Sequence, residues 1–216
     1  ELARAIPVFD VRSPGEFNHA SFPGAHSLPL FTDEERKVVG TLYKQQGRQR
    51  ATREGLGYFG PRMNEMVSAV EKITGHNKNS SETLPAVIVH CWRGGMRSAG
   101  VAWLLDLYGF EVYTLVGGYK AFRRWVLEQF ETDQPIRMLG GFTGSGKTDV
   151  IHALKEKGCR VIDLEGLANH KGSAFGALGL PPQPTQEMFE NCLAIALQER
   201  KNETCWLEDE SQRIGR

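Results

Sequence analysis

The sequence Cys91-Trp-Arg-Gly-Gly-Met-Arg97-Ser98 decides the fold of the first half of the chain. It follows the apolar run Ala86-Val-Ile-Val-His90 and precedes residues 99–108, in which apolar residues recur at helical spacing. A short apolar run predicts a buried strand, and the spacing after it predicts a helix. We therefore expect the Cys91 thiol to lie at the C-terminal end of a buried strand, on a loop that opens into a helix.

The composition of this loop is typical of an anion pocket built around a thiolate. Free backbone N–H groups at the helix start, the helix dipole and the guanidinium groups of Arg93 and Arg97 all favour a thiolate over a thiol. Two glycines let the backbone curl so that its amides point at a bound group. A buried cysteine that merely ends a strand would explain neither the glycines nor the arginines. We predict Cys91 and Arg97 as catalytic residues, and as the oxyanion- or donor-binding loop Trp92, Arg93, Gly94, Gly95, Met96 and Ser98.

Length and composition place the chain among globular proteins. Its 216 residues suffice for one large domain or two small ones, and 40% hydrophobic with 24% charged residues is ordinary. The four cysteines form no CxxC pair, which favours free thiols in a reducing compartment and suggests no zinc site. No apolar run approaches the length of a membrane span, and the first residues are not a signal peptide. We expect a cytoplasmic protein without a membrane partner.

The charge balance argues against bulk attraction to nucleic acid. The chain has 26 basic and 26 acidic residues, so its formal net charge is zero. We expect no DNA partner, and any nucleic-acid contact must come from local clusters. Residues 44–53 and 120–124 are basic and free of Asp and Glu. For the first of these stretches, a solvated loop and a contact with a phosphate backbone both stay open.

Short predicted strands alternate with predicted helices through residue 130. The strands are expected at 6–12, 25–30, 86–90 and 111–116, and the helices at 33–43, 63–73, 99–108 and 120–130. This alternation predicts a parallel α/β sheet. The polar stretch 131–135 is the predicted domain boundary.

Several motifs of this first half together resemble the rhodanese family. They are Asp10-Val-Arg-Ser-Pro-Gly-Glu-Phe17, Pro23-Gly-Ala25, the Cys91 loop and Gly117-Gly-Tyr119, and the resemblance covers about residues 2–130. In that family the cysteine carries sulfur as a persulfide cradled by loop amides. Five residues separate Cys91 from Arg97, a spacing also found in cysteine phosphatases, including some with a rhodanese-like fold. A plain sulfurtransferase and a phosphatase both stay open at this point.

The second half opens with a phosphate-binding motif. Residues 136–140 read as a strand, 141–148 match G-x-x-x-x-G-K-[ST] in full, and 149–157 read as a helix. The glycines let the backbone wrap phosphate oxygens, Lys147 adds a positive charge, and the Thr148 hydroxyl can hold Mg²⁺. The predicted phosphate-binding residues are Gly141, Thr143, Gly144, Ser145, Gly146, Lys147 and Thr148.

Two further apolar stretches end in carboxylates. Residues 159–165 and 204–210 each read as a strand, and the acids at their ends include Asp163, Glu208 and Asp209. The second stretch is placed like the acidic strand of a P-loop protein, so that Thr148 and Asp209 are candidates to hold Mg²⁺. Ordinary surface acids at strand ends are the alternative.

The chain as a whole resembles the bacterial tRNA 2-selenouridine synthases. The residues that carry this resemblance are Val39-Gly-Thr-Leu-Tyr-Lys-Gln-Gln-Gly47, residues 163–176 and Leu207-Glu-Asp-Glu-Ser211, together with the fusion of the two domains. The resemblance implies a transferase that replaces sulfur by selenium at C2 of the wobble 2-thiouridine, with selenophosphate as donor. It also implies an S-geranylated intermediate made from geranyl diphosphate, and an enzyme that supplies selenophosphate as a possible partner.

The expected fold is therefore α/β, with a rhodanese-like parallel-sheet domain at 1–131 followed by a P-loop NTPase-like domain at 135–216, of which only the N-terminal part is present. Backbone amides recognise phosphate whatever it is attached to, so the P-loop ligand is either a nucleotide or the prenyl diphosphate. A sulfurtransferase or phosphatase with a kinase-like domain, and a non-enzymatic nucleotide-gated module, are the competing classes. For the tRNA the candidate residues are Lys44, Arg48, Arg50, Arg53, Lys120, Arg123 and Arg124.

Overall fold

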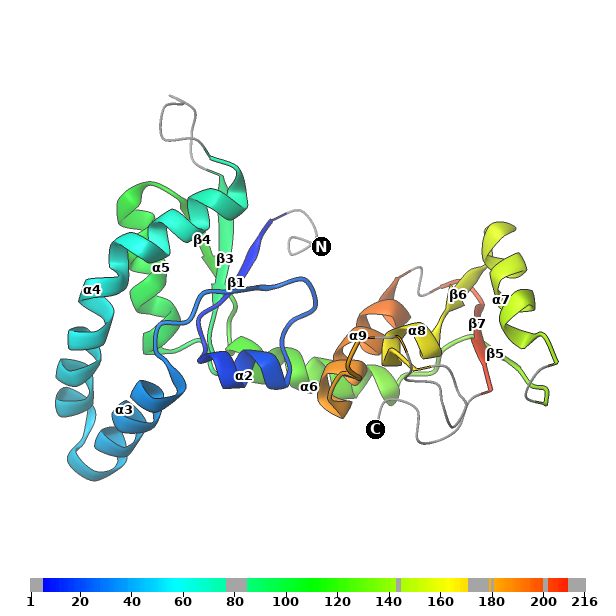
Figure 1. The fold of residues 1–216 in the computed structure, drawn as a ribbon, viewed down its shortest axis with the longest axis horizontal. Coiled ribbons are helices and arrows are strands. Elements are labelled where there is room, and N and C mark those ends of the chain that lie inside the picture. The colour runs from blue at the N-terminus through cyan, green and yellow to red at the C-terminus, as the bar shows by residue number, and fades with distance from the viewer. Residues whose placement is uncertain are drawn as a thin grey trace. The chain divides into compact units, whose positions relative to one another are not determined.

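The computed structural model describes residues 6–76, 85–142, 145–170, 179, 181–199 and 202–209. The chain divides into two compact units, residues 1–122 and 123–216 (Figure 1). This division falls inside helix α6 (Gly118–Phe130), before the boundary that the sequence predicts at 131–135. Each unit is built on its own parallel sheet, as the alternation of short strands and helices predicts.

The first unit contains a four-stranded parallel sheet of order β2-β1-β3-β4. Its strands are β1 (Val8–Asp10), β2 (His26–Ser27), β3 (Ala86–His90) and β4 (Glu111–Thr114). In the register, Phe9 lies beside Val89 and Asp10 beside His90. All four predicted strands of this half are confirmed, although β1, β2 and β4 are shorter than predicted.

Strand alternation gives this sheet two different faces. Phe9, Val11, Val87 and Val89 join one buried apolar core with residues of the surrounding helices, and Cys91 belongs to the same cluster. The residues between them on the strands, among them Asp10 and His90, point to the opposite face. The thiol therefore ends an apolar row of side chains, whereas polar groups end the other row.

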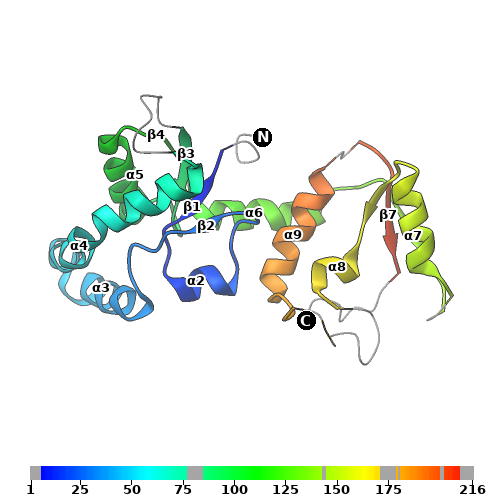
Figure 2. The ribbon, with the colours of Figure 1, turned by 45° about the horizontal axis from the view of Figure 1, so that its top comes forward.

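The helices of the first unit are α2 (Pro14–His19), α3 (Asp33–Gln46), α4 (Arg48–Thr74) and α5 (Met96–Tyr108). Helices α3 and α4 lie side by side as a hairpin joined at Gly47 (Figure 2). Of the two alternatives for residues 44–53, the loop is wrong, because α3 extends to Gln46 and α4 begins at Arg48, although the basic residues there are exposed.

The sequence pattern predicts only the second half of α4, because glycines and Pro61 interrupt the helical pattern before residue 63. Packing explains why the helix forms there. Ala51, Gly55 and Phe59 are all buried, and a Cβ added at Gly55 would lie 3.1 Å from the Phe31 ring. Tertiary contact with Phe31 thus overrides the low helix propensity of glycine.

The second unit contains a three-stranded parallel sheet of order β5-β7-β6. The strands are β5 (Ile136–Leu139), β6 (Arg160–Ile162) and β7 (Cys205–Glu208), and the helices after α6 are α7 (Lys147–Glu156), α8 (Leu164–Ala168) and α9 (Gln186–Gln198). Helix α7 lies on one side of this sheet and α8 with α9 on the other (Figures 1 and 2). Its buried cluster consists of Ile162, Leu197, Cys205 and Leu207. The predicted α/β class is confirmed for both units.

Candidate functional site

Cys91 lies immediately after β3, and its side chain is only 3% exposed. Its Sγ is 3.3 Å from the Ser98 hydroxyl and accepts a hydrogen bond from the Gly95 N–H at 3.4 Å. Ser98 is itself buried in the first turn of α5. The structure thus brings Cys91, Gly95 and Ser98 together as the sequence predicts.

The surroundings of Cys91 lower the pKa of its thiol. Burial by itself raises this pKa, but the Ser98 hydroxyl and the backbone N–H groups of Ser98, Gly95 and Arg93 outweigh it by hydrogen bonding to the sulfur. Hydrogen bonds, rather than the guanidinium groups that the sequence suggests, therefore favour the thiolate. The thiolate is the reactive form of a cysteine, so the loop prepares Cys91 as a nucleophile or carrier.

The start of α6 fixes the shape of this loop. The backbone N–H groups of Tyr119 and Lys120 donate to the carbonyls of Cys91 and Trp92, each at 2.9 Å. Gly118 has φ +59, and a Cβ there would lie 2.3 Å from the Cys91 carbonyl oxygen and 2.5 Å from the Gly94 nitrogen. Because the loop carbonyls are bound from this side, the loop N–H groups are left to face the sulfur.

A polar cluster supports the loop from the opposite face of the sheet. Arg12 is 1% exposed, donates to both carboxylate oxygens of Asp10, and lies 3.8 Å from the centre of the Tyr119 ring. His90 is fully buried, and neither ring nitrogen has a hydrogen-bond partner among the described residues. Burial lowers the pKa of His90, so this imidazole is neutral at pH 7.

Arg97 is held by a residue that the sequence pattern does not single out. Its Nη1 donates to Glu16 Oε2 at 2.8 Å. Burial raises the pKa of Glu16. Arg97, the Ser13 backbone and Arg36 lower it by more than burial raises it, so the pKa is about 2. The Arg97 charge is therefore partly neutralised by a carboxylate in the structure.

The remaining predicted residues of the Cys91 loop are exposed. Trp92 is 38% exposed and Met96 47% exposed, and Arg93, Gly94 and Gly95 are also exposed. Gly94 has φ +67, and a Cβ there would lie 2.8 Å from the Leu115 carbonyl. The exposed side chains of this loop are thus apolar at Trp92 and Met96 and charged at Arg93.

The phosphate loop of the second unit connects β5 to α7. Gly146 adopts a left-handed conformation, with φ +81, and caps α7. The Lys147 Nζ donates to the Gly141 carbonyl at 3.0 Å, and a Cβ at Gly141 would lie 2.7 Å from the Ser145 hydroxyl. Thr143 and Gly144 lie outside the described residues, as does the side chain of Thr148. The part that is described shows Lys147 folded back over its own loop.

The three predicted acids have different surroundings. Asp209 follows β7; its N–H donates to Leu139 O, and its Oδ2 would lie 3.8 Å from a Cβ added at Gly140. Glu208 is 5% exposed at the end of β7. Asp163 caps α8 by accepting from the Gly166 N–H at 2.8 Å. Asp209 is therefore the acid beside the phosphate loop, whereas Asp163 has a structural role as a helix cap.

The described residues contain no group of three His, Cys, Asp or Glu side chains that could hold a metal ion. A magnesium ion in a phosphate loop needs few protein ligands, because phosphate oxygens and water complete its shell. One carboxylate at Asp209 beside the loop fits that requirement.

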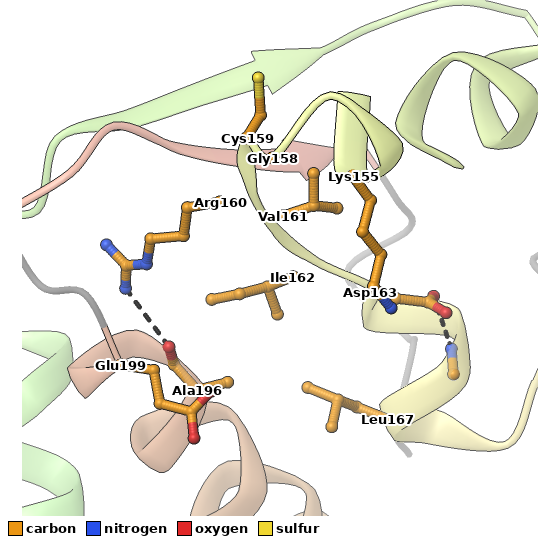
Figure 3. Close-up of a pocket in the computed structure, with 11 residues that line it drawn as sticks. Lys155, Gly158, Cys159, Arg160, Val161, Ile162, Asp163, Leu167, Ala196 and Glu199 are labelled. Carbon is orange, nitrogen blue, oxygen red and sulfur yellow. Dashed lines mark hydrogen bonds between the residues drawn. The ribbon is translucent and has the colours of Figure 1, made fainter. Parts of the chain in front are cut away.

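A cavity of about 430 Å³ in the second unit lies along β6 (Figure 3), and none of the predicted phosphate-binding residues is among those that line it. Two of its polar wall residues make hydrogen bonds: Arg160 donates through Nη2 to the carbonyls of Ala196 and Leu197, and Asp163 accepts from Gly166. Arg160 Nε is buried without a hydrogen-bond partner among the described residues. Lys155 and Glu199 also line it. We assign no chemistry to this cavity.

The other cysteines lack the environment of Cys91. Burial raises the pKa of Cys192 and of Cys205, and the latter belongs to the apolar core of the second unit. All four cysteines are free thiols. Three cysteines thus have a shifted pKa: that of Cys91 is lowered, and those of Cys192 and Cys205 are raised.

The residues predicted to contact tRNA fall on two helical regions. Lys44, Arg48, Arg50 and Arg53 are exposed around the α3–α4 junction, and Arg50 lies 3.8 Å from Glu54. In α6, Lys120 and Arg124 are exposed, and Arg124 lies 3.8 Å from Glu128. Arg123 pairs with Glu190 and donates to Asn191 of α9. Arg123 thus has a partner within the second unit, and the junction offers the freer cluster.

A buried low-pKa thiol on a rhodanese-type loop, followed in the chain by a phosphate loop, defines a protein that joins a rhodanese-like domain to a P-loop domain. Comparison with known families supports this class. Residues 1–124 match the rhodanese-like domain, and residues 134–216 match the tRNA 2-selenouridine synthase AAA domain. The chain belongs to the tRNA 2-selenouridine synthase family.

Its curated relatives carry the name tRNA 2-selenouridine synthase. The chain is 43% identical to the protein of Hydrogenovibrio crunogenus, over 99% of this chain and 59% of the relative. It is 42% identical to that of Shewanella oneidensis, over 97% and 54%, and 44% identical to that of Bdellovibrio bacteriovorus, over 98% and 55%. The chain therefore spans a little more than half the length of these relatives.

A solved structure is also similar to part of the chain. It is the N-terminal domain of a Clostridium difficile 630 protein described as ATP/GTP binding, with a TM-score of 0.51 and 34% identity. The match covers 56% of this chain and 89% of that one. In the part of our chain that the structure describes, no helix is both long and apolar enough to cross a membrane.

Proposed function

We propose that the protein is a tRNA-modifying transferase that replaces sulfur by selenium at C2 of the wobble 2-thiouridine, with selenophosphate as the selenium donor. The observation that carries this proposal is the buried Cys91 thiol, with its lowered pKa, in an amide-lined loop. The same chain contains the phosphate loop of the selenouridine synthase AAA domain. The names of the relatives support the reaction class.

In this proposal the first unit handles the selenium donor. The N–H groups of Gly95 and Ser98 and the Arg97 guanidinium attract an oxyanion. The Cys91 thiolate lies beside the bound donor, whose selenium stays at the selenide level, so no oxidant is needed.

In this proposal the second unit binds a diphosphate, and that diphosphate is geranyl diphosphate. The thiouridine sulfur would form a bond to the geranyl carbon as the carbon–oxygen bond to diphosphate breaks, and diphosphate leaves with the bonding electrons. The sulfur then becomes a leaving group: the selenium of selenophosphate bonds to C2 while the C2–sulfur bond breaks, and geranyl thiolate departs. Water would then attack the phosphorus, so that the selenium–phosphorus bond breaks, phosphate is released and the selenium stays on C2. Lys147 and the loop amides would hold the diphosphate charge. Thr148 and Asp209 would hold Mg²⁺, which supplies neutralising charge to the diphosphate.

The tRNA would be held by the exposed basic residues at the α3–α4 junction. Phosphate contacts position a nucleic acid without reading its sequence, so a local cluster suffices on a chain with no net charge. A tRNA substrate places the reaction in the cytoplasm. An enzyme that produces selenophosphate is the partner that the donor requires.

The decisive experiment replaces the thiol in cells. A strain without the gene is complemented with wild-type protein, Cys91→Ala or Cys192→Ala, and the wobble uridine is analysed by mass spectrometry. We expect no 2-selenouridine with Cys91→Ala and normal amounts with Cys192→Ala. Selenium incorporation by a folded Cys91→Ala protein would refute the assignment of the thiol. Unchanged levels of 2-selenouridine in the strain without the gene would refute the function itself and favour a sulfurtransferase or phosphatase.

A further inference from the structure

Two guanidinium groups converge on one carboxylate oxygen beside the Cys91 loop. Glu16 Oε2 accepts from Arg97 Nη1 at 2.8 Å and lies 3.0 Å from Arg36 Nε. The same oxygen also accepts from the Ser13 backbone N–H and hydroxyl, at 3.1 and 3.2 Å. This trio of Glu16, Arg36 and Arg97 therefore has one positive charge more than it has negative charges.

The first turn of α3 holds Arg36 in place. Thr32 and Glu35 form a capping box at the start of this helix, and Glu35 also pairs with Arg62 of α4. The Asp33 carboxylate accepts from the Gly15 N–H in α2, with both oxygens at 3.0 Å. Arg36 is thus presented by a helix end that is fixed at three points, although its side chain is 50% exposed.

Arg36 has unused hydrogen-bonding capacity. The contact to Glu16 uses Nε, and within the described part of the chain its two terminal nitrogens make no hydrogen bond. A guanidinium has five N–H donors in a planar fork, which suits a tetrahedral oxyanion. The Arg97 side chain, 22% exposed, also uses a single nitrogen for Glu16.

The charge of the proposed donor requires more than Arg97. A phosphate-type anion has about two negative charges at pH 7, whereas the Glu16 carboxylate offsets one of the two guanidinium charges beside the loop. Loop amides and the start of α5 contribute only fractional charge, about half of one unit for a helix end. A second guanidinium at this position would complete the recognition of such an anion.

We propose that Arg36 is a second anion-binding residue of the Cys91 pocket and acts with Arg97 on the phosphate oxygens of the selenium donor. This inference rests on the proposed function only for the identity of the donor. Glu16 then positions both arginines, and the anion binds to the N–H groups that Glu16 leaves open. A simple ion pair that joins α2 to α3 is the competing explanation of the Arg36 contact.

The test measures how well inorganic thiophosphate protects Cys91 from iodoacetamide. Alkylation of the Cys91 peptide is followed by mass spectrometry at a series of thiophosphate concentrations, for wild type, Arg36→Gln, Arg36→Lys and Lys37→Gln. Lys37 is the exposed neighbour of Arg36 on α3, so Lys37→Gln removes the same charge without the contact to Glu16. The alkylation rate without thiophosphate shows whether the loop is intact in each variant.

We expect the half-protecting concentration to rise roughly tenfold in Arg36→Gln, the size of one charge-assisted hydrogen bond. Lys37→Gln should stay close to wild type, and Arg36→Lys should recover part of the protection. Equal protection of wild type and Arg36→Gln would overturn the proposal. So would an effect of Arg36→Gln on tRNA binding alone, or a wild-type Cys91 that thiophosphate does not protect.

Because no turnover is measured, this test separates the inference from the proposed function. If the protein made no 2-selenouridine but Arg36→Gln still weakened thiophosphate protection, Arg36 would stand as an anion-binding residue and the proposed reaction would fall. If selenium incorporation occurred with unchanged protection in Arg36→Gln, the reaction would stand and the role of Arg36 would fall.

Discussion

The Cys91 loop and the phosphate loop are two solutions to the same task. Each follows a parallel strand and opens a helix, and in the proposed function each points backbone N–H groups at an anion. The Cys91 loop is clamped by residues distant in sequence, since Gly118, Tyr119 and Lys120 contact its backbone from the start of α6. The described part of the phosphate loop is held mainly by its own residues, through Lys147 and Gly141.

The strands that precede the two loops also differ in how deeply they are buried. The strand before Cys91 is buried along most of its length, whereas β5 lies at the edge of the sheet that the described residues form, with Ile136 39% and Met138 54% exposed. A reactive sulfur needs a fixed set of hydrogen bonds to keep its pKa low, and distant packing supplies that. A diphosphate brings its own charge and can order the groups that bind it. The comparison therefore predicts a rigid first site and a second site that its ligand organises.

The largest effect is expected from Gly118→Ala, which would disrupt the contacts between α6 and the backbone of the Cys91 loop. The new methyl group would overlap the Cys91 carbonyl and the Gly94 nitrogen at a left-handed φ. We expect a loss of about 4–5 kcal/mol in the free energy of unfolding of the first unit. Denaturant titration with peptide-level hydrogen exchange in β3 and α5 measures this unit separately from the second one.

Gly75→Ala is the matched control for this variant. Gly75 also has a left-handed backbone, with φ +71, but a Cβ there meets nothing within 4 Å. Its cost should be that of the backbone conformation alone, about 1 kcal/mol. Equal losses for the two variants would show that the clamp contributes nothing beyond the glycine conformation.

Acid should loosen the first site through Glu16. Its pKa of about 2 lies below the ordinary value of 4.5, so the folded state gains stability above pH 4.5 and loses it as the pH falls towards 2. The full contribution at pH 7 is about 3 kcal/mol. We expect the difference in unfolding free energy between wild type and Glu16→Gln to shrink steadily from pH 5 to about pH 2. A difference that does not change with pH would contradict the pairing with Arg97 and Arg36.

The second site is probed by Lys147→Ala. Loss of its charge should weaken the bound diphosphate by about 1.5–3 kcal/mol, the size of a charge-assisted hydrogen bond. Titration calorimetry with geranyl diphosphate and with ATP measures this for each ligand. Unchanged affinity for both would remove the phosphate role from this loop. Binding of ATP alone would favour a kinase-like second domain.

Local sequence patterns predict those features of the molecule that local residues determine. The strand before Cys91, the Ser98 contact and the helix after Gly146 all follow from neighbouring residues. The pairing of Arg97 with Glu16 joins residues 81 positions apart, and no spacing signals it. Helix α4 likewise depends on contact between Gly55 and Phe31, which overrides the glycine and proline signals in its sequence.

In the proposed function the two loops bind small anions, so a polyanion has to be held elsewhere. Lys44, Arg48, Arg50 and Arg53 are exposed at the α3–α4 junction, and of these Arg50 has an acidic neighbour, Glu54 at 3.8 Å. Removal of one phosphate contact should lower the slope of log affinity against log salt by roughly 0.7–0.9. We expect Arg48→Ala and Arg53→Ala each to show this change, and Arg50→Ala a smaller one.

The combined slope change of the four residues can be measured by filter binding of tRNA at several salt concentrations. The proteins compared are wild type and a variant in which all four residues are alanine. A slope that falls by two to three units, on the order of one unit per contact, would place the tRNA backbone on the junction. Identical slopes would mean that none of the four residues touches a phosphate. Contact would then have to come from the α6 strip, where Arg123 is already paired with Glu190 and only Lys120 and Arg124 are exposed. Two side chains give a slope change of about two units at most, so the salt dependence of wild type alone would show whether that strip is enough.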